Sequence, residues 1–284
     1  MIDRRKFFKR AGRALAAGTS LTVGYGFWEA SQIRIRRETV SVPHLPPAFV
    51  RKTVAILADL HHGPLVGLSF IRDAVRIANS LNPDLFALVG DFAHKGHQSP
   101  ERLPACLDAL AELRAPLGVF AVPGNHDLHR DGQVYRDAIA ATPLIDLTNK
   151  NRPVEIDGQR LWLAGVDDLF CGKPNLTKAL TGVPDQSAVV LLCHNPDLAE
   201  DRPDLRVGLM LSGHLHGGQL YFPGFGALWL PSKYGQKYIR GLVQGPASRV
   251  YISRGLGEAG IPLRLNSPPE INLLTLVSDT SRTL

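Results

Sequence analysis

The sequence is poor in cysteine and has no long apolar run in its body. Its 284 residues include only Cys106, Cys171 and Cys193. Their odd number and wide spacing argue against a disulfide framework and against a cysteine metal site. Beyond the N-terminal segment, no stretch is long and apolar enough to span a bilayer. Repeats and low-complexity tracts are also missing, which argues against a solenoid or an array.

Excess charge of either sign is also missing from most of the chain. The whole chain carries a formal charge of +6, but residues 1–37 hold nine Lys or Arg against Asp3 and Glu29. That segment alone contributes +7, so the remaining residues sum to −1. The basic isoelectric point therefore belongs to the N-terminal segment, and we expect no nucleic-acid partner.

The composition is that of a globular protein, with 44% hydrophobic and 20% charged residues. A Pro-rich stretch containing Pro43, Pro46 and Pro47 precedes the first strong strand pattern. No later linker divides the chain. We therefore expect residues 1–30 to be a targeting segment or anchor, 31–50 a linker and 51–284 one domain.

The N-terminus carries Arg4-Arg5-Lys6-Phe7-Phe8-Lys9, followed by a weakly hydrophobic, Ala/Gly-rich stretch over 11–28. This arrangement resembles a twin-arginine export signal, and a basic disordered tail is the alternative. The signal predicts the twin-arginine translocase as a partner and the periplasm or the outer face of the inner membrane as the location. Trp28-Glu29-Ala30 lacks the small residues of a cleavage site, which is compatible with an uncleaved membrane anchor.

Apolar runs alternate with amphipathic segments through the first half. Strands are predicted at 53–58, 84–89 and 118–122, and helices at 69–81 and 104–113. The second half is richer in strands, predicted at 154–156, 160–164, 188–193, 207–211, 249–253 and 271–276. Asp157-Gly158 between two of them is a strong hairpin signal. The pattern predicts an α/β fold with a largely parallel sheet covered by helices.

Five of these apolar runs end in residue types that bind metals. They are Asp59 and His61, Asp91, Asn125 and His126, His194, and His214 and His216. Taken singly, turn chemistry explains Asp and Asn equally well, and His194 could be a satisfied interior histidine. Active sites of open α/β sheets form at the carboxyl ends of strands, so five coincidences there favour a metal site.

In this order the motifs resemble those of the calcineurin-like metallophosphoesterases. The blocks are Asp59-Leu60-His61, Gly90-Asp91, Gly124-Asn125-His126-Asp127, His194 and Gly213-His214-Leu215-His216. The resemblance covers about residues 52–280. It implies a four-layered α/β/β/α sandwich, in which two mixed β-sheets are flanked by helices.

The resemblance also implies roles for the residues. Asp59, His61 and His216 would hold one divalent ion, and Asn125, His194 and His214 the other. Asp91 would bridge both, because a carboxylate has two oxygens to share. Mixed N and O ligation suits Mn, Fe or Zn. A metal-activated hydroxide would attack phosphorus, His126 would stabilise the transition state or protonate the leaving oxygen, and Asp127 would orient His126.

The substrate is the weakest inference from the sequence. Leu220 to Leu230 is aromatic and turn-rich, which favours either a core hairpin or an apolar rim for an amphiphilic phosphodiester. Gly217-Gly218-Gln219 and Ser253-Arg254-Gly255-Leu256-Gly257 resemble a bacterial phosphodiesterase subgroup. Some relatives there hydrolyse UDP-2,3-diacylglucosamine in lipid A metabolism, which we keep as an alternative. A non-catalytic metal-binding module is the other alternative.

Overall fold

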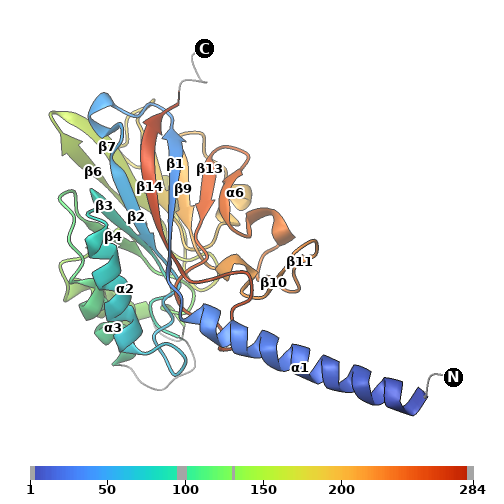
Figure 1. Cartoon of the computed structure of the whole chain (residues 1–284). Helices are drawn as coiled ribbons and strands as arrows, with labels where there is room; N and C mark the ends of the chain where they lie inside the picture. The colour runs from blue at the N-terminus through green and yellow to red at the C-terminus, as the bar shows by residue number, and fades with distance from the viewer. Residues whose placement is uncertain (1–3, 95–100, 130–131, 280–284) are drawn as a thin grey trace.

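Two six-stranded β-sheets pack face to face and form the centre of the protein (Figure 1). The computed structural model describes residues 4–94, 101–129 and 132–279. The first sheet has the order β1 (Arg34–Val42), β14 (Glu270–Ser278), β2 (Thr53–Leu57), β3 (Leu85–Val89), β4 (Val119–Val122) and β5 (Ile145–Asp146). The second has the order β12 (Gly241–Gln244), β13 (Arg249–Ile252), β9 (Leu209–Ser212), β8 (Val189–Leu192), β7 (Gln159–Gly165) and β6 (Lys150–Ile156).

Both sheets are mixed. Strands β2, β3, β4 and β5 run parallel, and β14 is antiparallel to β2. In the second sheet β13, β9, β8 and β7 run parallel, while β12 and β6 are antiparallel edge strands. Parallel neighbours end at one edge, so the polar residues that follow them are brought together.

The central strands are buried on both faces, which explains their continuous apolar sequence. Along β2, Val54 and Ile56 belong to the core between the sheets, whereas Ala55 and Leu57 face the outer helices. This is the two-residue alternation of a strand. Each side chain of the strand therefore packs against one layer or the other.

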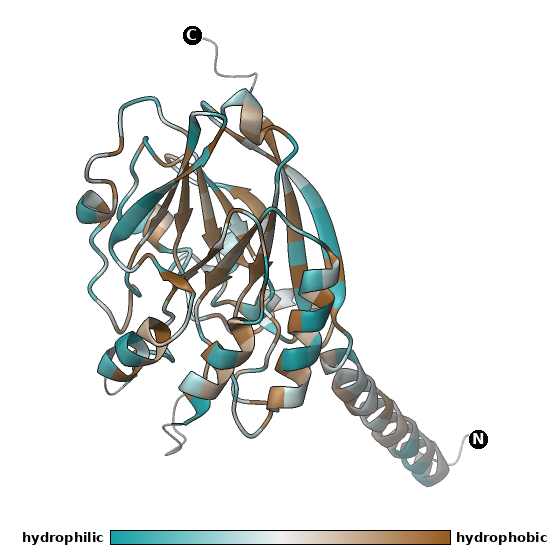
Figure 2. Cartoon of the chain, turned by 90° about the vertical axis from the view of Figure 1, so that its left-hand side faces the viewer, coloured by the Kyte–Doolittle hydropathy of each residue, from teal (hydrophilic) through white to brown (hydrophobic). Residues whose placement is uncertain are grey.

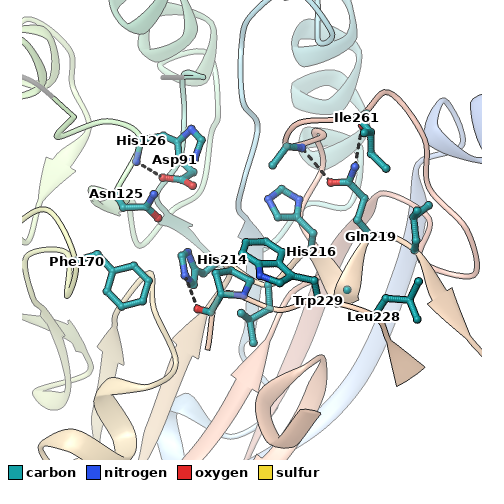
Figure 3. A pocket seen from close by; sticks show the side chains of 15 residues that line it. Asp91, Asn125, His126, Phe170, His214, His216, Gln219, Leu228, Trp229 and Ile261 are labelled. Atoms are coloured by element: carbon teal, nitrogen blue, oxygen red, sulfur yellow. Dashed lines mark hydrogen bonds between the residues drawn. The ribbon is translucent and has the colours of Figure 1, made fainter. Parts of the chain in front are cut away.

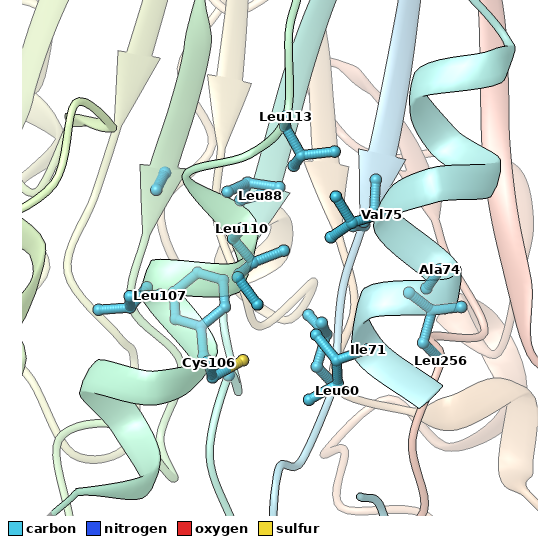
Figure 4. Packing of buried hydrophobic residues seen from close by; sticks show 14 of the residues in the cluster. Leu60, Ile71, Ala74, Val75, Leu88, Cys106, Leu107, Leu110, Leu113 and Leu256 are labelled. Carbon is cyan, nitrogen blue, oxygen red and sulfur yellow. The ribbon is translucent and has the colours of Figure 1, made fainter. Parts of the chain in front are cut away.

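Helices α2 (Leu68–Ser80), α3 (Arg102–Leu110) and α4 (Gly132–Ala140) cover the outer face of the first sheet (Figures 1 and 2). Ile71, Ala74 and Val75 of α2 meet Leu107 and Leu110 of α3 in this layer (Figure 4). Buried α2 residues recur every three or four positions, as the sequence predicts. The helix begins after Gly67, one residue before the predicted start.

Short helices α5 (Leu176–Ala179) and α6 (Leu198–Asp201) cover the outer face of the second sheet. Three 3-10 turns lie at Pro47–Phe49, His216–Gly218 and Gly235–Tyr238. A small hairpin of β10 (Tyr221–Phe222) and β11 (Gly226–Ala227) stands apart from both sheets. The layers confirm the predicted α/β/β/α sandwich of two mixed sheets.

The β6–β7 hairpin forms as predicted from the Asp157-Gly158 pair. Asp157 and Gly158 have φ values of 50° and 72°, the left-handed pair that a tight two-residue hairpin requires. The register from Lys150–Gly165 to Ile156–Gln159 is continuous.

The segment expected to be a linker, residues 31–50, contains a strand. Residues 34–42 form β1, which pairs in parallel with β14 from Arg34–Glu270 to Val42–Ser278. The start of β1 is polar and exposed, and only Val40 and Val42 are buried, so the sequence pattern is weak. The folded body therefore includes residues before 51.

Helix α1 (Arg4–Ala30) projects from the body beside the β10–β11 hairpin (Figure 1). Among the described residues, no helix combines the length and the apolarity needed to cross a membrane.

Candidate metal centre

Every candidate ligand that the sequence indicates lies at the carboxyl end of a strand, in one buried cluster. Strands β2, β3 and β4 of the first sheet and β8 and β9 of the second supply them. Two groups have donor atoms within 4.8 Å of one another, Asp59 with His61 and His216, and Asp91 with His194 and His214. The first group has the members of one predicted site, and the second contains His194 and His214 of the other together with Asp91, while the assignment of Asn125 stays a prediction.

In the first group the imidazoles face each other. Nε2 of His61 lies 3.0 Å from Nε2 of His216, and His216 Nε2 lies 3.6 Å from Asp59 Oδ1. Three donor atoms from two segments far apart in the sequence, Asp59 with His61 and His216, thus surround one point. The space between them fits a divalent cation with N and O ligands.

In the second group neighbouring carbonyls fix which ring nitrogen faces the cluster. His194 Nδ1 lies 2.7 Å from the carbonyl of Val89, which leaves Nε2 pointing inward. His214 Nε2 lies 3.2 Å from the carbonyl of Pro231, which leaves Nδ1 pointing inward, 3.2 Å from His194 Nε2. Such outer hydrogen bonds orient histidine ligands in metal sites.

Asp91 lies between the two groups. Its Oδ2 is 3.6 Å from His61 Nε2 on one side and 3.2 Å from His194 Nε2 on the other. Its Oδ1 accepts a hydrogen bond from the backbone N–H of His126 at 2.8 Å. This position is the one a bridging carboxylate would need.

The backbone at these residues is strained. Asp59, His61, Asp91, His214 and His216 all have φ between 49° and 73°. Non-glycine residues rarely adopt this left-handed conformation, and it costs about 1 kcal/mol or more at each position. Five such residues in one cluster indicate that the fold holds them for their side-chain positions.

Two glycines allow the loops to approach closely. A Cβ on Gly124 would collide with Asp91 Oδ1, and one on Gly213 would collide with Asp59 Oδ2. Both positions therefore require glycine for steric reasons, which explains why glycine precedes Asn125 and His214.

Burial sets the protonation states of the histidines. It lowers the pKa of His61 and of His216 well below the usual value, and that of His214 to about 3. Burial alone would also lower the pKa of His194, but the adjacent Asp91 carboxylate raises it well above its usual value. Burial raises the pKa of Asp59 to about 7. Three imidazoles are thus neutral at pH 7, the form that binds metals.

The donor set fits a pair of divalent ions. The buried atoms Asn125 Oδ1 and His61 Nδ1 have no hydrogen-bond partner among the described residues. Leaving such an atom unsatisfied costs about 1–3 kcal/mol, so Asn125 Oδ1 in particular is suited to a ligand. The inward nitrogens of the four histidines face one another in pairs, His61 with His216 and His194 with His214.

His126 and Asp127 lie beside the ligands but differ in burial. The half-buried His126 ring packs edge-on against His61 with centroids 4.6 Å apart. Asp127 is buried and accepts hydrogen bonds from the backbone N–H groups of Phe92, Ala93 and Gly124. It therefore ties the β3 and β4 loops together. The predicted orientation of His126 by Asp127 stays a prediction.

His94 is a site residue that sequence reasoning did not select. Its ring lies 5.2 Å from that of His126 and 5.7 Å from that of His61, measured between centroids. The three histidines have nitrogens within 4.8 Å of one another. The sequence signal that could have indicated His94 is its position three residues after the proposed ligand Asp91. His97, another unassigned histidine, lies outside the described residues.

A cavity of about 380 Å³ opens beside the cluster (Figure 3). Its lining includes the polar residues Asp91, Asn125, His126, His214 and His216 together with a set of apolar side chains. The apolar wall consists of Phe170, Leu215, Leu220, Leu228, Trp229, Pro231, Ala259 and Ile261. The cavity therefore places the polar cluster next to hydrophobic side chains.

The aromatic stretch is exposed, which excludes a core hairpin. Phe225, Leu228 and Trp229 are 86%, 79% and 76% exposed. The base of this loop is fixed at both ends. The Gln219 amide binds Ala259 and Ile261, and the Asp197 carboxylate accepts hydrogen bonds from Ser232 and Lys233.

Comparison with known proteins agrees with this geometry. A sequence model described as "Calcineurin-like phosphoesterase" matches residues 52–218. The chain is 32% identical over 289 residues to the uncharacterized metallophosphoesterase YkuE of Bacillus subtilis, with 98% of both chains covered. It is 30% identical over 291 residues to the phosphodiesterase YaeI of Escherichia coli, covering 98% of this chain and all of that one.

Among solved structures, the Haemophilus influenzae NAD nucleotidase shares the fold. It superposes with a TM-score of 0.51 and 11% identity, over 72% of this chain and 45% of the nucleotidase. Whole-length sequence similarity, a matching family model and the buried Asp/His cluster agree. The chain therefore belongs to the calcineurin-like phosphoesterase family of phosphoester hydrolases.

Proposed function

We propose that this protein is a dinuclear-metal phosphodiesterase acting on an amphiphilic phosphodiester. The observation that carries the proposal is the position of Asp91, whose carboxylate lies between two groups of buried N and O donors. Asp59, His61 and His216 would hold one ion, and Asn125, His194 and His214 the other. The chemistry of the donors is compatible with Mn, Fe or Zn.

When bound, two divalent ions would supply Lewis-acid activation of water and neutralise charge on the phosphoryl group. The ligand side chains determine where the two ions would lie. The Asp91 carboxylate also accepts a hydrogen bond from the backbone N–H of His126, so His126 is held in place relative to the ligands.

His126 would act as the proton donor to the leaving oxygen. It lines the cavity, is half-buried and has its ring against His61. A positioned general acid typically accelerates such a step by about 10²–10⁴-fold. A non-catalytic metal-binding module would have no use for an imidazole at this position.

The apolar wall of the cavity supports an amphiphilic substrate. Phe170 packs against the His214 ring with centroids 5.2 Å apart, and Trp229 and Ile261 line the same cavity. Their positions suit a phosphoryl group at the metals and a hydrocarbon group against the wall. The relative named phosphodiesterase supports the choice of a diester over a monoester.

We further propose export by the twin-arginine translocase and a location at the outer face of the inner membrane. The exposed side chains of Phe225, Leu228 and Trp229 and the basic N-terminus support this location. Apolar side chains insert into a bilayer, and Lys and Arg attract anionic lipids. A UDP-2,3-diacylglucosamine hydrolase would work on the cytoplasmic face, which favours another phosphodiester.

A substrate panel with defined metal tests the proposal. The purified full chain, loaded with Mn²⁺ or Zn²⁺, is assayed on bis(p-nitrophenyl) phosphate, p-nitrophenyl phosphate, a phospholipid and UDP-2,3-diacylglucosamine. We expect the diesters to be hydrolysed at least about tenfold faster than the monoester. Preferred hydrolysis of the monoester would overturn the phosphodiesterase assignment. Two bound ions without any hydrolysis would favour the binding module.

A further inference from the structure

The last turn of helix α1 is built into the folded body. The carbonyl of Gly26 accepts a hydrogen bond from the backbone N–H of Arg264 at 3.2 Å. The carboxylate of Glu29 accepts one from the backbone N–H of Ser267 at 3.3 Å. Gly26, Glu29 and Ala30 are buried, although the helix is exposed over residues 16–25.

The two residues held by α1 also hold His216. Ser267 Oγ donates to the carbonyl of His216 at 2.7 Å. The fully buried guanidinium of Arg264 donates to the carbonyl of Ser267 at 2.7 Å, and its Nη2 lies 3.5 Å from His216 Nδ1. The contact is tight, since a Cβ on Gly217 would collide with Ser267 Oγ.

Glu29 is also fixed on its own side. The phenol of Tyr25, one turn earlier, donates to its other carboxylate oxygen at 2.9 Å. A short relay of hydrogen bonds therefore runs from Tyr25 and Glu29 through Ser267 to the backbone of His216. The Tyr25–Glu29 bond lies within one helical turn, but the bonds from Glu29 to Ser267 and from Ser267 to His216 join segments far apart in the sequence, so local structure alone does not maintain the relay.

We propose that the last turn of α1 helps to form the metal centre. Glu29 is a positioning residue, which fixes Ser267 and through it the backbone of His216. The N-terminal segment then has a second role besides targeting, and the functional enzyme retains residues 26–30. The inference rests on the metal-binding part of the proposed function. It is independent of the identity of the substrate.

The test measures metal affinity in the full-length chain. Titration of metal-free Glu29→Ala with Zn²⁺ or Mn²⁺ is expected to show binding about tenfold weaker at one of the two sites, the range seen when outer partners of ligands are removed. Glu29→Gln keeps an oxygen that accepts from Ser267 and is expected to restore most of the affinity. Leu21→Ala, on the exposed part of the same helix, is the matched control and should bind normally.

Hydrogen exchange separates positioning from general unfolding. In Glu29→Ala, exchange should accelerate at residues 213–218 and 264–267 and stay unchanged in β2 and β8. If Glu29→Ala does not fold, Tyr25→Phe removes the phenol hydrogen bond that fixes the Glu29 carboxylate and tests the same relay. Unaltered affinity in the folded variant tested would overturn the proposal.

Three further outcomes are decisive. Asp91→Ala is expected to abolish binding of both ions. If it does so while Glu29→Ala binds normally, the proposed function stands and the role of α1 does not. If Asp91→Ala binds two ions, the metal centre itself is misassigned. An exported mature chain that begins after Ala30 and binds metal fully, as shown by intact mass and titration, would also exclude the role of α1.

Discussion

The carboxylate of Asp59 accepts a hydrogen bond from the backbone N–H of His214, with distances of 2.9 Å to Oδ1 and 3.1 Å to Oδ2. Asp59 belongs to one donor group and His214 to the other. A side chain from the first sheet thus fixes the backbone of a ligand from the second. The two halves of the metal centre are coupled by the packing of the sheets, and substitutions in either sheet are expected to affect both ions.

Removing the shared carboxylate should empty both sites. Asp91→Ala leaves His61 and His194 without the oxygen that lies between them. We expect metal content to fall from two ions per chain to near zero, measured by mass spectrometry of the purified protein. Asp185→Ala, an exposed acid, serves as the control. Two retained ions per chain would contradict the bridging role.

Removing His126 should separate binding from chemistry. His126→Ala deletes the proposed proton donor and no proposed metal ligand. We expect two ions per chain and a fall of about 10²–10⁴-fold in kcat for bis(p-nitrophenyl) phosphate. The exposed His129 provides the control, His129→Ala. Full activity of His126→Ala would rule out general acid catalysis by this residue.

Adding one methyl group at Gly213 should disrupt the site. The Cβ of Gly213→Ala would collide with Asp59 Oδ2, so the β2 or β9 loop must shift. Overpacking of this kind typically costs about 1–3 kcal/mol. Denaturant unfolding should show that loss together with reduced metal content. Gly67→Ala, which meets only ordinary contacts, should change the free energy of unfolding by less than about 1 kcal/mol. Equal effects in the two variants would argue against the close approach.

The exposed apolar side chains of the loop from Leu220 to Leu230 should contribute to membrane binding. Phe225→Ser removes the most exposed aromatic side chain of the loop. Burying a phenylalanine side chain is worth about 1.5–3 kcal/mol, so vesicle affinity should fall about tenfold or more. Flotation with vesicles containing anionic phospholipid measures this. Leu205→Ser changes an apolar residue outside the loop that is 77% exposed, and this variant should bind normally. Identical flotation of both variants would exclude the loop from docking.

Chelation should destabilise the folded protein. A ligand that binds only the native state adds about 2.7 kcal/mol at a concentration of 100 times its Kd. Treatment with EDTA should therefore lower Tm, and returning Zn²⁺ or Mn²⁺ should restore it. The same experiment on Asp91→Ala should show no shift. A wild-type Tm that is insensitive to EDTA would count against bound metal.

Much of the site could be predicted because its signals are local. Each of the five strands is an apolar run, and the ligand residues follow within four positions of its end. The hairpin at Asp157-Gly158 is equally local, because two left-handed residues set its geometry. Strand β1 could not be recognised in this way. Its polar first half pairs with β14, more than 200 residues away in the sequence.

The sequence by itself determined which side chains gather in the candidate metal centre and the order along the chain of the strands that carry them, because apolar periodicity and strand-end chemistry are properties of short segments. The tertiary structure decided the remainder. Carbonyls of Val89 and Pro231 choose the inward nitrogens of His194 and His214, and sheet packing brings Asp59 to His214. The contacts of α1 with Arg264 and Ser267 likewise join residues that only the folded chain places together.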